Sequence, residues 1–68
     1  MKPLVEVFWT DHAFSPDGNG LVKQRSVGFL VKEKKRFIVI AQSCDENGKY
    51  MDRLTVGRDM LRKVKRLR

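Results

Sequence analysis

The sequence is poor in cysteine and histidine, with one of each among 68 residues, and it has no long apolar run. A disulfide takes two cysteines, so none can form within the chain, and a reducing, intracellular compartment is favoured. One cysteine and one histidine are too few for a zinc site. No apolar stretch approaches the roughly 18 residues of a membrane span, and residues 1–7 lack the pattern of a signal peptide. We therefore expect a cytoplasmic protein without a metal, a cofactor or a membrane segment.

Groups suited to catalysis are equally scarce. The one histidine, His12, has serine and aspartate neighbours in a predicted loop, but so short a chain offers no cleft or orienting shell for a triad. Cys44 has no base or helix N-terminus near it in the sequence to activate its thiol. The turns at residues 17–20 and 45–48 match neither a phosphate-binding loop nor a calcium loop. We expect a protein that is not an enzyme.

Acidic residues are outnumbered, with 8 Asp and Glu against 15 Lys and Arg, for a net charge of +7. The excess is concentrated at the end of the chain. Residues 58–68 contain six basic residues and one acidic residue, whereas the other 57 residues contain nine and seven. A basic tail on a nearly neutral body predicts an anionic partner, which is nucleic acid, an acidic protein face or a membrane surface.

The length predicts one domain over residues 1–68, and its pattern is that of short strands. Residues 27–31 and 37–41 are rich in Val, Ile and Phe and flank the charged connector K-E-K-K-R, which predicts a central β-hairpin. We expect strands over residues 4–11, 21–32, 37–43 and 49–56. Turn residues predict a long loop over residues 12–20 and a tight turn at residues 45–48. Phe14, in that loop, is either a lid on the core or an exposed contact.

The expected core follows from the alternation of side chains along each strand. It is predicted to contain Val7, Phe29, Ile38, Ile40 and Leu54. Gly28 lies on the face opposite Phe29, where a missing side chain permits a bend or the close approach of a neighbouring strand.

Residues 57–68 are open to two interpretations. Met60, Leu61, Val64 and Leu67 have helical spacing. A helix would leave a small barrel without its last strand, so we favour a 3₁₀ turn over residues 58–60 and a fifth strand over residues 61–67. The fold predicted is all-β, a small five-stranded SH3-like or Sm-like barrel with a 3₁₀ turn before the last strand.

Several segments resemble short phage- or prophage-encoded proteins that form SH3-like barrels, mostly of unassigned function. The segments are W-T-D at residues 9–11, G-F-L-V at 28–31, I-V-I-A-Q-S at 38–43 and D-R-L-T-V at 52–56. The resemblance covers most of residues 4–67 and implies the fold and a mobile-element origin. It implies no catalytic residue.

The basic clusters are the candidate site, because phosphate attraction needs charge and no sequence reading. Small barrels can add stacking of single-stranded bases on aromatic rings. The predicted nucleic-acid-binding residues are Lys34, Lys35, Arg36, Tyr50, Arg62, Lys63, Lys65 and Arg66. The leading hypothesis is a non-enzymatic, regulatory barrel that binds nucleic acid. A protein-interaction module that modulates a host protein with an acidic face, through Phe14, and a self-assembling ring are the alternatives.

Overall fold

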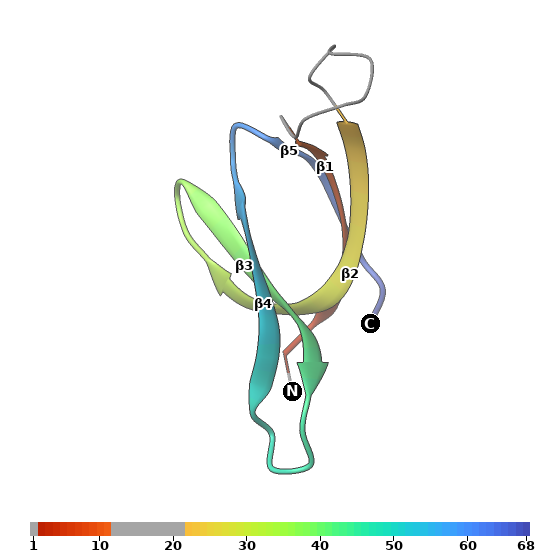
Figure 1. Cartoon of the computed structure of the whole chain (residues 1–68), viewed down its shortest axis with the longest axis vertical. Coiled ribbons are helices and arrows are strands. Elements are labelled where there is room, and N and C mark those ends of the chain that lie inside the picture. Colours follow the sequence, from red (N-terminus) through yellow and green to blue (C-terminus); the bar gives the residue numbers. More distant parts are fainter. Residues whose placement is uncertain (1, 12–21) are drawn as a thin grey trace.

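The computed structural model describes residues 2–11 and 22–68, and over these residues the protein is an all-β, five-stranded antiparallel sheet (Figure 1). The strands are β1 (Leu4–Asp11), β2 (Val22–Glu33), β3 (Phe37–Cys44), β4 (Tyr50–Gly57) and β5 (Leu61–Arg66). Each lies within one residue of the expected limits, and the all-β prediction is confirmed. The predicted loop at residues 12–20, with His12 and Phe14, lies outside the described residues.

Strand β2 is the central strand of the sheet, whose order is β4-β3-β2-β1-β5. It joins one half, formed with β3 and β4, to the other half, formed with β1 and β5. Residues 22–29 pair with β1 and residues 29–33 pair with β3. The register shifts between Leu30 and Lys32, an irregularity of the kind that bends a strand. Figure 1 shows β2 curving through the molecule, with the β3–β4 hairpin on one side and β1 and β5 on the other. Over the described residues no ladder joins β4 to β5, so the sheet is curled but open.

The last segment is a strand and not a helix. Residues 61–66 pair antiparallel with β1, with Val64 opposite Val7. A hydrogen-bonded turn leads into it, in which the Met60 N–H donates to the Gly57 carbonyl at 3.0 Å. The Met60 carbonyl then accepts from the Thr10 N–H at 2.9 Å, which fixes the start of β5 beside the end of β1. Pairing with β5 satisfies the N–H and C=O groups along the edge of β1 that a helix at this place would leave unpaired.

The core lies between the two halves of the sheet. Its buried members are Val5, Val7, Ile38, Ile40 and Val56, and Trp9, Leu30, Leu54 and Leu61 pack against them. Val7, Ile38 and Ile40 are therefore buried as predicted, whereas Leu54 is half-buried at the edge of the core. The indole N–H of Trp9 donates to the Ser26 hydroxyl at 3.1 Å, so the polar atom of this large side chain is satisfied.

The prediction that Phe29 belongs to the core is wrong. Phe29 is half-buried, and its cross-strand partners are Leu4 and Ala41. Leu4 alternates with the core residue Val5, so these side chains lie on the outer face of the sheet. The ring of Phe29 meets Tyr50 there, with 5.4 Å between ring centroids. The inner face of β2 is formed instead by Ser26, Gly28 and Leu30.

Gly28 is buried because β3 approaches it closely, as predicted. A Cβ atom at this position would lie 2.7 Å from the carbonyl oxygen of Ala41. We expect Gly28→Val to lower the free energy of unfolding by about 1–3 kcal/mol, despite the better strand propensity of valine. Gln42→Val, at an exposed position of β3, is the control, with an expected change within about 0.5 kcal/mol. A raised denaturant midpoint for Gly28→Val would show that the backbone yields without strain.

The two edge strands carry features that oppose pairing with another sheet. In β4, Asp52 has a left-handed backbone with φ of 57°, and its carboxylate accepts a hydrogen bond from the Ser43 hydroxyl at 2.7 Å. This residue interrupts the extended edge that a ring assembly would use. In β5, four of the six residues are Lys or Arg, and charged side chains discourage edge-to-edge contact.

Candidate nucleic-acid interface

The side of β1 that faces away from the core is lined with cations from its two neighbouring strands. Because Val5 and Val7 are buried, the intervening residues Glu6, Phe8 and Thr10 point outward. Residues directly opposite on antiparallel strands share a face. The register therefore decides which side chains of β2 and β5 surround these three residues.

Phe8 lies at the centre of this surface. Its cross-strand partners are Arg25 on β2 and Lys63 on β5. Glu6 is opposite Lys65, and Thr10 is opposite Lys23. Arg62 falls where the β1–β5 register shifts, and its guanidinium Nη1 lies 3.4 Å from the Thr10 hydroxyl, to which it donates. We call this surface the outer basic face, defined by Lys23, Arg25, Arg62, Lys63 and Lys65 around Phe8.

Two contacts order the outer basic face without neutralising it. The Lys63 ammonium lies 5.8 Å from the centre of the Phe8 ring, within the range of a cation–π contact. The Arg25 guanidinium pairs with the Glu6 carboxylate at 3.3 Å. The Arg25 side chain remains 68% exposed and that of Glu6 only 19%, so the carboxylate is the more covered of the two. Five cations against this one carboxylate leave the face strongly positive.

The hairpin tip, residues 34–36, forms a second basic group. Lys34, Lys35 and Arg36 are all exposed. Arg58 ties the tip to the turn before β5, because its backbone N–H donates to the Arg36 carbonyl at 2.8 Å and its Nε donates to the Lys34 carbonyl at 3.1 Å. Arg58 also lies 3.7 Å from Glu33, an exposed ion pair. The tip is thus fixed by its backbone, and its three charged side chains project into solvent.

Tyr50 and Arg66 lie at neither of these two places. Arg66 is opposite the core residue Val5, so it leaves β5 on the other side from Lys63 and Lys65. It lines a pocket together with Phe29, whose ring contacts Tyr50. The Tyr50 hydroxyl accepts a hydrogen bond from the backbone N–H of Lys2 at 3.1 Å. The predicted binding residues therefore divide into three groups instead of forming one surface.

Phe8, Lys23 and Arg25 belong to this site, although none of them is among the binding residues predicted from the sequence. The signal for the two cations was present, since Lys23 and Arg25 alternate with Gln24 and Ser26 in a strand and so share one face. The net charge of each segment does not reveal these two cations, because the basic and acidic residues of positions 1–57 almost cancel. The place of Phe8 could not be found in this way, because its cationic neighbours come from residues 15 or more positions away in the sequence.

Comparison of the chain with protein-family models, with curated proteins and with solved structures returned no match. Over residues 2–11 and 22–68, the structure has no helix with the length and hydropathy needed to cross a membrane.

Proposed function

We propose that this protein is a non-enzymatic, regulatory small barrel that binds nucleic acid through its basic clusters, and that it is of phage or prophage origin. The observation that carries the binding proposal is the outer basic face, where five cations from two strands surround a half-buried aromatic ring. Nucleic-acid binding surfaces combine these two elements, phosphate-contacting cations and a ring on which a base can stack.

The finer description of the fold is part of the same proposal. An SH3-like barrel is consistent with a first strand paired to the last, a long second strand shared between both halves of the sheet and a tight turn before β5. In this proposal the turn at residues 58–60 is the 3₁₀ element, and β4 and β5 approach to complete the barrel. Such a scaffold presents the outer side of β1 as a rigid, gently curved surface.

The rigidity of this surface matters for affinity. The cations project from paired strands, and their backbone positions are fixed before any ligand arrives. Preorganised groups lose less entropy on binding than groups on a disordered tail. Lys63 and Lys65, two residues apart on one strand, are also spaced by about 7 Å along the strand, which is close to the spacing of successive phosphates in an extended single strand.

The test is a titration of the purified protein with labelled single-stranded and duplex oligonucleotides at two salt concentrations. Each neutralised phosphate contributes about −0.9 to the slope of log K against log salt on duplex and about −0.7 on single strands. With about four to six contacts, a fourfold rise in salt is expected to weaken binding by roughly two to three orders of magnitude. Scrambling the oligonucleotide sequence should change the affinity little.

Absence of binding at the lower salt concentration contradicts the proposal. The protein-module hypothesis predicts that result, together with a host protein that stays bound after nuclease treatment. In that case the outer basic face is a docking surface for an acidic protein.

A further inference from the structure

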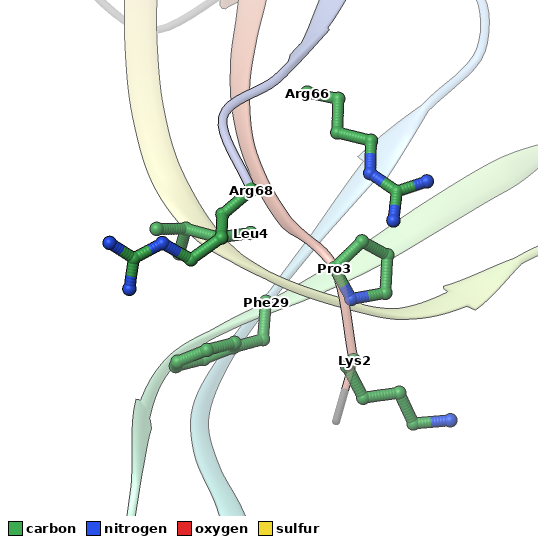
Figure 2. A pocket seen from close by; sticks show the side chains of 6 residues that line it. All are labelled: Lys2, Pro3, Leu4, Phe29, Arg66 and Arg68. Carbon is green, nitrogen blue, oxygen red and sulfur yellow. The ribbon is translucent and has the colours of Figure 1, made fainter.

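A pocket of about 310 Å³ opens where the start of β1 meets the end of β5 (Figure 2). Three apolar side chains and three cationic side chains line it. They are Pro3, Leu4, Phe29, Lys2, Arg66 and Arg68. Leu4 and Phe29 lie on the same side of the sheet as the outer basic face, at the end where β1 begins, whereas Arg66 leaves β5 on the other side. None of the residues that define the outer basic face lines the pocket.

The backbone around this pocket is held by hydrogen bonds between three segments. The Leu30 N–H donates to the Pro3 carbonyl at 2.8 Å, which joins the segment before β1 to β2. The Leu67 N–H donates to the Leu4 carbonyl at 2.8 Å, which joins the segment after β5 to β1. The Tyr50 ring makes an edge contact with the Phe29 ring, and its hydroxyl accepts a hydrogen bond from the backbone N–H of Lys2. The apolar wall is therefore formed without a ligand.

The composition of the lining identifies the kind of ligand. Among the described residues that line the pocket none is acidic and three carry positive charge, so the lining is suited to an anion. The wall of Phe29, Leu4 and Pro3 calls for an apolar, flat group. A volume of about 310 Å³ is at the small end of the range of ligand pockets, roughly 300–1,000 Å³, and suits one small unit.

The two arginines are placed to hold two anionic groups. Figure 2 shows the guanidinium of Arg66 on the side of Pro3 and that of Arg68 on the side of Leu4 and Phe29, so the two charged groups point to different sides of the pocket. Guanidinium groups bind phosphate oxygens through paired N–H donors. One nucleotide within a single strand has this arrangement, because a flat base is flanked by a phosphate on each side.

We propose that this pocket binds one nucleotide of a single strand, with the base against Phe29 and the flanking phosphates on Arg66 and Arg68. This inference rests on the proposed function, since a pocket of this kind belongs to a protein that binds single strands. It assigns different roles to the two binding sites. The outer basic face binds phosphates of either duplex or single strand, and the pocket gives preference for an unpaired base, which a duplex cannot insert.

The direct test is an NMR titration of the isotopically labelled full chain with adenosine 3′,5′-bisphosphate, adenosine 5′-monophosphate and inorganic pyrophosphate. The bisphosphate is expected to shift the amide signals of Leu4, Phe29 and Leu30 and to bind about tenfold or more tightly than the monophosphate, because it adds a charge-assisted contact. Pyrophosphate has comparable charge without a base and is expected to bind more weakly than the bisphosphate.

Variants separate the pocket from general electrostatics. Arg66→Gln with Arg68→Gln is expected to weaken bisphosphate binding at least tenfold, and Lys34→Gln with Lys35→Gln removes the same charge at the hairpin tip as a matched control. Phe29→Leu keeps an apolar side chain and is expected to weaken binding to single-stranded oligonucleotides about fivefold or more, with duplex affinity unchanged. A thermal melt of each variant shows whether it remains folded.

The pocket inference is overturned if the bisphosphate shifts signals of the outer basic face instead of the pocket, or if pyrophosphate binds as tightly at the same amides. It is also overturned if the paired arginine variant and its hairpin-tip control lose the same affinity. These outcomes leave oligonucleotide binding by the parent protein intact. Failure of the parent to bind any oligonucleotide contradicts the proposed function separately.

Discussion

Replacing Ile40 by alanine is expected to lower the free energy of unfolding by about 2–5 kcal/mol. Ile40 is fully buried, and its cross-strand partners Leu30 and Leu54 belong to the two strands on either side of β3. Truncation leaves a cavity that these neighbours cannot fill without moving the sheet. A domain of this length has a total stability of roughly 3–10 kcal/mol, so the variant should be close to unfolded at ordinary temperature.

Chemical denaturation monitored by the fluorescence of Trp9 measures this effect, since the indole packs against the core. Ile40→Val removes one methylene and is expected to cost only about 0.5–1.5 kcal/mol, which gives a graded series at one site. Val27→Ala, at a side chain that is 46% exposed, is the surface control. An unchanged denaturant midpoint for Ile40→Ala would show that β3 is not the centre of the core.

Reversing the charge of Lys63 and Lys65 to glutamate is expected to reduce oligonucleotide affinity on the order of a hundredfold or more at low salt, because two charge-assisted phosphate contacts are lost and repulsion is added. The salt dependence should become shallower, by about 0.9 in slope on duplex for each contact removed. Both side chains are exposed on β5, so the fold should remain intact, and circular dichroism and a thermal melt verify this.

The matched control is the reversal of Lys34 and Lys35, which changes the net charge by the same amount at the hairpin tip. A much smaller loss of affinity is expected there, because these side chains project from a narrow turn and do not belong to the group of cations around Phe8. Equal losses for the two double variants would show that net charge governs binding and that the outer basic face has no special role.

Much of this architecture could be predicted from the sequence because its signals are local. Alternating apolar residues mark β1, a continuous apolar run marks β3, and the turn residues Asp45 and Gly48 mark the turn between β3 and β4. The Asp45 carboxylate accepts hydrogen bonds from the N–H groups of Asn47 and Lys49 at 2.9 and 2.8 Å, and Gly48 has φ of 83°, so this turn depends only on residues within it. The basic character of the tail was likewise evident from composition.

The inward face of β2 could not be predicted in the same way. Alternation divides a strand into two faces but does not say which one meets the core. The more apolar face, with Val27 and Phe29, turns outward, because close approach of β3 requires the glycine at position 28 on the inner side. The close approach of the Ala41 backbone to Gly28 decides which face of β2 meets the core. The local sequence pattern does not predict a contact between residues so far apart in the chain.

The sequence by itself determined that this is a small, basic, strand-rich chain with its first four strands within one residue of their observed positions, since strand propensity, turn chemistry and charge belong to single residues and their near neighbours. The last segment has helical spacing in the sequence, and its pairing with β1 makes it a strand. Only the tertiary structure decided which charges act together. Pairing of β1 with both β2 and β5 brings Lys23 and Arg25 onto the same surface as Lys63, whereas Arg66 leaves the other side of β5 at the end of the strand, next to the pocket that Leu4 and Phe29 also line. The physical reason is that register and face are properties of strand pairs, and the members of each pair lie far apart along the chain.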